Sequence, residues 1–324
     1  MSESPAGRRR LPRAVFFGSG AFGVPILDAV AGAPEVELAG VVTVPDKAVG
    51  RHRDITPVPV AARARERGVQ LLQPATLRTA DAVAKIVSLG ADVGVLADYG
   101  RIVPNDVLAA IPRGILNIHP SLLPRHRGAT PIAAAILAGD AETGVTIIRM
   151  DAGVDTGPIV ATDRWPLDGT ETAPQVEAEA AARGAALLRA TLGAWLEGRI
   201  VPVPQAESGA TTTRPFRRAD GRLDPDAPLV ELERRIRALQ PWPGTWVETV
   251  AGRLTIWRAE AVPGWESGDA AQPGVIGRFG LHARDGYLAL REVQPAGGTR
   301  MTFEELVRGR PAIVGSSVVR DAGA

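Results

Sequence analysis

The 324-residue sequence contains no cysteine, which excludes disulfide bonds and thiolate metal sites. Its net charge is only +1, so any affinity for nucleic acid has to come from a local basic patch. The sequence also lacks an apolar run that approaches the roughly 18 residues of a membrane-spanning helix. These absences predict a cytoplasmic protein without a membrane partner.

Hydrophobic residues make up 45% of the chain and charged residues 23%, which is typical of globular domains. The length is sufficient for two domains, each with its own core. Residues 1–13 are polar and basic and lack the apolar segment of a secretory signal. We expect a flexible extension there, and the alternative is an arm that contacts RNA.

The amino-terminal part alternates between short apolar strands and helical patterns. Strands are predicted at residues 14–17, 36–43, 69–72 and 93–97, with helices at 24–30, 58–67 and 80–89. This alternation favours a doubly wound parallel sheet, which binds ligands at the carboxyl ends of its strands. The first strand leads into a G-x-G-x-x-G pattern at Gly18, Gly20 and Gly23. That pattern permits a nicotinamide site, although such glycines also serve any tight turn between a strand and a helix.

Residues 115–124 form the end of an apolar strand that opens into a loop at Pro120. Side chains two apart in a strand point to the same side, so Asn117 and His119 share one surface, roughly 7 Å apart. An amide can donate a hydrogen bond to a developing oxyanion, and an imidazole can move protons near neutral pH. A hydrogen-bonded structural histidine is the alternative interpretation.

A second polar cluster, at residues 151–157, follows the apolar strand predicted at residues 144–150. It has two aspartates and two glycines, a composition typical of a tight loop. Such a loop could bring a carboxylate back to the imidazole of His119. Asp155 is the candidate.

These motifs together resemble the catalytic module of the folate-dependent formyltransferases. The resemblance implies catalytic roles for Asn117, His119 and Asp155, and it implies that 10-formyltetrahydrofolate is the formyl donor. It also implies that a folate contact is made by the segment Ser121, Leu122, Leu123 and Pro124. The alternative is that Leu122 and Leu123 are ordinary core residues. Neither the resemblance nor the four scattered histidines predict a metal.

Residues 44–57 form a basic loop bounded by prolines. It resembles the insertion with which tRNA-acting members of this family reach the acceptor end, so Arg51 and Arg53 are expected to bind tRNA. Relatives usually continue with Gly and Lys after Arg51, whereas this chain has His52-Arg53-Asp54. A solvated loop without a ligand is the alternative.

Asp98 stands where relatives commonly have Ala. Its carboxylate could lie near His119 and disturb it, or could point to solvent, and the sequence leaves both open.

The carboxyl-terminal part differs in pattern from the first. A long helix at residues 175–196 is followed by a Pro- and Ser-containing linker at 201–213, a helix at 229–239 and several short β segments, including one at 274–280. Short strands at this spacing, and a resemblance to the tail of the tRNA-acting members, predict a small OB-like β-barrel. We therefore expect an extension at 1–13, a Rossmann-like α/β formyltransferase domain at 14–200, the linker, an OB-like domain at 214–311 and a tail at 312–324.

The resemblance covers nearly the whole chain and implies a transferase of protein biosynthesis. The expected reaction moves the formyl group of 10-formyltetrahydrofolate to the α-amine of initiator methionyl-tRNA, for translation initiation, and leaves tetrahydrofolate. The alternative acceptor is an amine on a nucleotide-linked sugar. A nicotinamide-dependent oxidoreductase and a non-catalytic RNA-binding protein are more distant alternatives. We expect a monomer.

Overall fold

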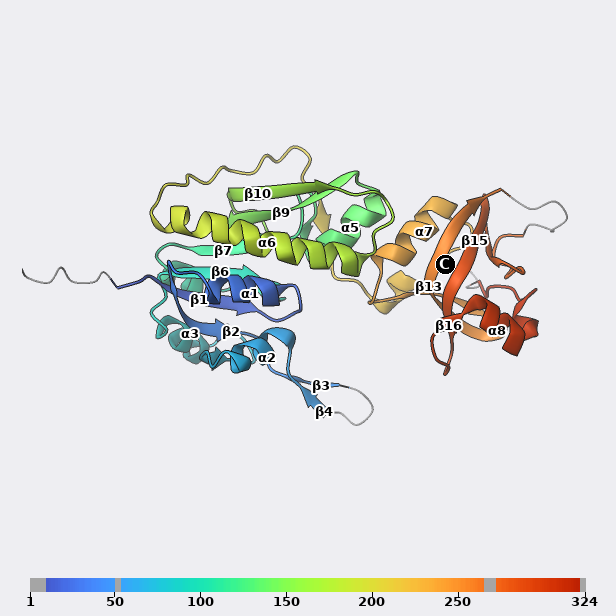
Figure 1. The fold of residues 1–324 in the computed structure, drawn as a ribbon, viewed down its shortest axis with the longest axis horizontal. Coiled ribbons are helices and arrows are strands. Elements are labelled where there is room, and N and C mark those ends of the chain that lie inside the picture. The colour runs from blue at the N-terminus through green and yellow to red at the C-terminus, as the bar shows by residue number, and fades with distance from the viewer. Residues whose placement is uncertain (1–9, 50–53, 265–271, 321–324) are drawn as a thin grey trace, which may run out of the picture. The chain divides into compact units, whose positions relative to one another are not determined.

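The computed structural model describes residues 10–49, 54–264 and 272–320 (Figure 1). The chain divides into two compact units. The first contains Met1–Ala129, Glu142–Trp165 and Glu177–Thr212, and the second contains Thr130–Ala141, Pro166–Val176 and Thr213–Ala324.

A seven-stranded sheet with the order β10-β9-β7-β6-β1-β2-β5 forms the centre of the first unit. Its strands are β1 Arg13–Gly18, β2 Glu37–Val42, β5 Leu71–Leu72, β6 Val93–Ala97, β7 Ile115–His119, β9 Glu142–Arg149 and β10 Ile159–Pro166. The five neighbouring strands β5, β2, β1, β6 and β7 run parallel to one another, which confirms the predicted parallel sheet. β9 adds to β7 in the antiparallel direction, which the sequence interpretation did not include.

The chain builds this sheet outward from β1 in two directions. It first adds β2 and β5 on one side, then returns to add β6, β7, β9 and β10 on the other. The order therefore reverses between β1 and β6. In open α/β sheets, ligands bind in the crevice outside the carboxyl ends of the strands at such a switch point.

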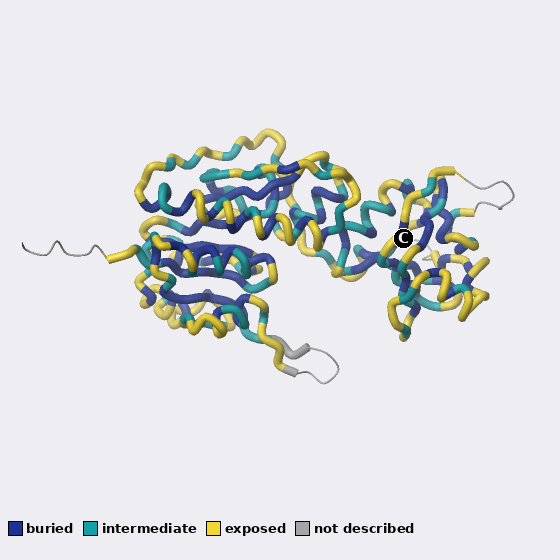
Figure 2. Tube along the Cα trace, viewed as in Figure 1, coloured by how far each residue is buried: buried dark blue, intermediate teal, exposed yellow. Residues whose placement is uncertain are grey.

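Helices cover this sheet, and its central strands β1, β6 and β7 are almost continuously buried in Figure 2. Apolar side chains on both faces of a strand are typical of a parallel sheet between two helical layers. The helices of the first unit are α1 Gly23–Ala31, α2 Pro59–Glu66, α3 Ala80–Val87 and α4 Asn105–Ala110, and most of α6 Ala173–Leu196 also belongs to it. α6 approaches β7 closely, because a Cβ atom at Gly184 would lie 2.9 Å from Ile118.

Short strands interrupt the segment that was predicted as a loop at residues 44–57. β3 Lys47–Val49 and β4 Asp54–Thr56 pair in the antiparallel direction. The tip between them lies outside the described residues, and with it Arg51 and Arg53. A further two-stranded sheet joins β8 Arg127–Gly128 to β11 Thr212–Thr213.

The second unit is built around an antiparallel sheet, which confirms the predicted β domain. Its strands are β12 Thr245–Thr249, β13 Gly252–Pro263, β14 Gly280–Ala283, β15 Gly286–Pro295 and β16 Met301–Thr302. Its helices are α5 Pro131–Ala138, α7 Leu229–Ala238 and α8 Phe303–Gly309, with 3-10 helices η1 Arg218–Gly221 and η2 Pro311–Ile313. The prediction of a strand over residues 274–280 is wrong. Before β14 begins at Gly280, only isolated bridges form there, and Gly274 adopts a φ of +90°, outside the extended region.

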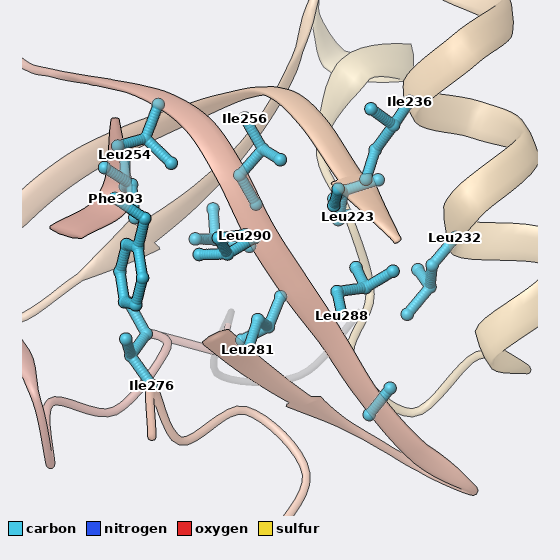
Figure 3. Close-up of a cluster of buried hydrophobic side chains, with 14 of the residues drawn as sticks. Leu223, Leu232, Ile236, Leu254, Ile256, Ile276, Leu281, Leu288, Leu290 and Phe303 are labelled. Atoms are coloured by element: carbon cyan, nitrogen blue, oxygen red, sulfur yellow. The ribbon is translucent and has the colours of Figure 1, made fainter. Parts of the chain in front are cut away.

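Figure 3 shows the core of this unit, where leucine and isoleucine side chains from the sheet and α7 point toward one another. Leu288 of β15 and Ile256 of β13 are completely buried. Alternate strand residues supply this core, because one face of an antiparallel sheet is packed and the other is solvated.

We expect Leu288→Ala to lower the free energy of unfolding by about 2–5 kcal/mol, because it removes buried methyl groups and leaves a cavity. Val250→Ala is the matched control, since Val250 is 77% exposed and its truncation leaves no cavity. Urea unfolding of both variants measures the difference. Equal stability of the two variants would contradict the packing seen here.

Candidate active site

Strand β7 places Asn117 and His119 at its carboxyl end. Their exposed fractions are only 7% and 5%, so both polar side chains are inside the protein. A buried polar group has to find hydrogen-bond partners, because the loss of water is otherwise costly. Both side chains find such partners.

The loop between β9 and β10 has the tight geometry expected of residues 151–157. Asp151 Oδ1 accepts hydrogen bonds from the Gly153 backbone N–H at 3.0 Å and the Thr156 hydroxyl at 2.7 Å. A Cβ atom at Gly157 would lie 2.0 Å from the Arg149 carbonyl oxygen, so only glycine fits there. Asp155 has a φ of +53°, which turns its side chain toward β7.

The Asp155 carboxylate meets three groups of the site. Its Oδ1 accepts a hydrogen bond from Asn117 Nδ2 at 2.9 Å, and its Oδ2 accepts one from the Gly128 backbone N–H at 2.8 Å. Oδ2 also lies 3.6 Å from His119 Nδ1. The structure thus brings together the three residues predicted as catalytic. Because the Asn117 amide carries two N–H groups, one is left for a ligand.

His119 is held from its other side by the main chain. Its Nε2 lies 3.0 Å from the His126 carbonyl oxygen. A carbonyl only accepts, so Nε2 carries a hydrogen and donates it. Burial lowers the pKa of His119, and the charge of Asp155 partly opposes this shift. The imidazole is therefore neutral at pH 7, with an unprotonated Nδ1 facing Asp155, ready to take up a proton that the carboxylate would stabilise.

The four residues predicted to contact folate differ in how far they are buried. The Ser121 hydroxyl donates to the Arg125 carbonyl oxygen at 2.8 Å, and the Leu123 backbone N–H donates to the Thr146 hydroxyl at 3.3 Å. Ser121 and Leu123 are buried, whereas Leu122 and Pro124 are half-buried. Leu122 and Pro124 are thus the two side chains of the segment most available to a ligand.

Two residues support the catalytic loop without having been predicted. Gln205 Nε2 donates to the carbonyl oxygens of Asp155 and Gly157, each at 2.7 Å. The buried Arg127 in turn donates from Nε to Gln205 Oε1 at 3.0 Å. Gln205 lies in the predicted linker, where nothing in the sequence marked it.

A cavity of about 890 Å³ lies in the second unit. Residues of α7, β13 and the segment from Gly169 to Gln175 line it, and none of the predicted site residues does. Within the described ranges, no group of three or more His, Asp or Glu is placed to hold a metal ion. No helix in the same ranges is long and apolar enough to cross a membrane.

The sequence matches family models over most of its length. Residues 12–192 match the formyl transferase model, and residues 216–311 match the model of the formyl transferase C-terminal domain. The chain therefore belongs to the formyltransferase family and is a transferase.

Individual relatives carry a narrower name. The chain is 41% identical over 310 residues to the methionyl-tRNA formyltransferase of Symbiobacterium thermophilum, covering 93% of this chain and 94% of that protein. It has the fold of the methionyl-tRNA formyltransferase from Clostridium thermocellum, with a TM-score of 0.54 at 17% identity over 80% of this chain and 96% of that one. HypX from Aquifex aeolicus in complex with tetrahydrofolic acid shares the fold too, with a TM-score of 0.58 at 15% identity over 91% of this chain and 46% of that one.

Proposed function

We propose that this protein transfers the formyl group of 10-formyltetrahydrofolate to the α-amine of initiator methionyl-tRNA. The observation that carries the proposal is the joined set of Asn117, His119 and Asp155 in a chain that matches a methionyl-tRNA formyltransferase over 93% of its length. Such a reaction belongs to translation, and it places the protein in the cytoplasm, where we expect a monomer.

The folate donor would lie at the carboxyl end of β7. Leu122 and Pro124 offer apolar surface for its flat ring system, in line with the resemblance of this segment to the folate contact of the family. Residues 44–57 would contact the acceptor end of the tRNA through Arg51 and Arg53.

The reaction needs stabilisation of one developing negative charge and movement of one proton. The amine nitrogen attacks the formyl carbon, negative charge collects on the formyl oxygen, and the bond from that carbon to the folate nitrogen then breaks. Asn117 would donate its remaining N–H to the oxygen. His119 Nδ1 would take the amine proton, directly or through water, and Asp155 would stabilise the imidazolium. The proton finally goes to the folate nitrogen, so the charges balance.

The test mixes the purified protein with 10-formyltetrahydrofolate and methionyl initiator tRNA and follows formyl-methionyl-tRNA. We expect multiple turnovers, because Asn117, His119 and Asp155 are already in contact and the folate is consumed as a co-substrate. Elongator methionyl-tRNA and uncharged initiator tRNA are the controls. If no product forms while tetrahydrofolate still binds, the proposed acceptor is wrong, and an amine on a nucleotide-linked sugar becomes the substrate to assay.

A further inference from the structure

Asp98 lies at the switch point of the first sheet, at the carboxyl end of β6 beside β1. Its carbonyl oxygen accepts hydrogen bonds from the backbone N–H groups of Ser19 at 2.9 Å and Gly20 at 3.3 Å. It has a φ of +50°, uncommon for a residue other than glycine. Because Leu96 is level with Asn117 in the parallel pair of β6 and β7, Asp98 and His119 end neighbouring strands at the same edge of the sheet.

The side chain of Asp98 fills the space above Gly20. A Cβ atom at Gly20 would lie only 1.7 Å from Asp98 Oδ2, so the carboxylate requires glycine there. In a dinucleotide site, the corresponding glycine lets the backbone approach a pyrophosphate. Here a carboxylate takes that place and would repel a phosphate, which disfavours a dinucleotide at this turn.

In the described parts of the chain, no cationic side chain is paired with this carboxylate. Burial raises the pKa of Asp98 to about 6, and the negative charge of Glu177 on α6 adds to the shift. Glu177 itself has its pKa raised by burial. The nearby guanidinium of Arg101 donates instead to the carbonyl oxygens of Pro74 and Ala75. Among the described residues, no hydrogen bond or ion pair links either carboxylate to a Lys, Arg or His.

Two residues with uncharged hydroxyl groups, Ser19 and Tyr99, adjoin Asp98. The Ser19 hydroxyl donates to the Tyr99 carbonyl oxygen at 3.3 Å, and the Tyr99 hydroxyl is buried. Asp98 is nevertheless exposed, so solvent reaches a carboxylate that protein atoms surround on its other sides. Two neighbouring acids without a cation are unfavourable for the fold, and such an arrangement is typical of a functional site.

We propose that Asp98 binds the ammonium group of the incoming aminoacyl acceptor and takes one proton from it, which releases the neutral amine to attack the formyl carbon. This inference rests on the proposed function. In the step, one N–H bond of the ammonium breaks and an O–H bond forms on the Asp98 carboxyl, so positive and negative charge disappear together. The accessible carboxyl then returns its proton to solvent.

The acidity of the two partners suits this transfer. An α-amino group has a pKa of about 7.7–8.0, and an ordinary Asp has one of about 3.9. With the pKa of Asp98 raised to about 6, the transfer is less unfavourable than it would be to an ordinary aspartate. Below pH 6 Asp98 is protonated and cannot act, and above pH 8 the free amine needs no help. The contribution of Asp98 is therefore confined to the range between these values.

The experiment compares wild type, Asp98→Asn and the control Asp106→Asn, which changes an exposed aspartate on α4. Initial rates of formyl-methionyl-tRNA formation are measured from about pH 6 to pH 9. Asp98→Asn should lower kcat/KM for the tRNA by about 10²-fold near pH 7, a typical effect for an acid-base group, and approach wild type near pH 9. The KM for the folate and the rates of Asp106→Asn should remain unchanged.

Each outcome decides between the two hypotheses. If wild type forms no product, the proposed function and the role of Asp98 fail together. If wild type forms product but Asp98→Asn is unaffected, or loses the same factor at every pH, only the role of Asp98 is rejected.

Thermal unfolding tests whether the Asp98 carboxylate stabilises the folded state. A carboxyl whose pKa is raised in the fold stabilises the folded state when protonated, and this contribution is lost as the pH rises through the folded pKa. Asp98→Asn should therefore have a higher Tm than wild type at pH 7.5, and the difference should disappear near pH 4. A lower Tm of the variant at pH 7.5 would make Asp98 a structural residue and overturn the proposal.

Discussion

His119→Ala is expected to reduce turnover by about 10²–10⁴-fold, the typical loss when an acid-base group is removed. The buried imidazole is fixed in one orientation by the His126 carbonyl oxygen and presents its unprotonated Nδ1 to Asp155. Asn117→Ala should cost about 10²–10³-fold, because it removes the donor to the formyl oxygen. Single-turnover rates with saturating folate and methionyl-tRNA measure both losses.

The matched control is Asn105→Ala, which truncates an exposed asparagine at the start of α4. It should retain wild-type turnover. Far-UV circular dichroism and thermal unfolding are recorded for every variant, because Asn117 also loses a hydrogen bond to Asp155. Near-normal turnover of folded His119→Ala and Asn117→Ala would reject the assignment of this site.

The parts of the fold that were predicted well have strong local signals. β6 was expected at residues 93–97, and it forms there because a continuous apolar run suits a buried parallel strand. Helix α5 has such local signals at both ends. It begins at Pro131, whose φ suits a first turn, and ends at Gly139, which adopts the left-handed conformation.

Other elements depend on information that a local pattern does not hold. The six residues of α4 are too few to show a period, and nothing in the residues of β9 sets its direction against β7. Helix α8 was missed although its signal is visible, because Thr302 and Glu305 form a capping box at its start. The strand expected at residues 274–280 does not form before Gly280, because Gly274 and Gly277 supply no side chain to pack.

In the candidate site too, some features follow from local sequence patterns and others only from tertiary packing. Neighbouring positions on one strand were enough to place Asn117 and His119 on a common surface, and the loop composition marked Asp155. Its contact with the Gly128 N–H joins positions 27 residues apart, and its loop is held by Gln205, 50 residues away. Such partners follow from tertiary packing. The position of Asp98 above Gly20 likewise emerged only from the packing of β1 against β6.

Asp155→Asn is expected to lower turnover by about 10²–10⁴-fold, because it removes the charge that stabilises a protonated His119. The Asp155 carboxylate accepts from Asn117 Nδ2 with one oxygen and from the Gly128 N–H with the other. An amide has only one oxygen, so its NH₂ group would face one of these donors. The variant therefore disturbs the charge and the position of Asn117 together.

The control for this variant lies on the same loop. Asp151→Asn keeps an oxygen that can accept from the Gly153 N–H and the Thr156 hydroxyl, so the loop should hold its shape and turnover should stay near wild type. A loss in Asp151→Asn as large as that in Asp155→Asn would show that loop geometry governs the rate. A loss confined to Asp155→Asn, with folate affinity retained, would place the effect in the carboxylate, because binding of the donor does not require a protonated imidazole.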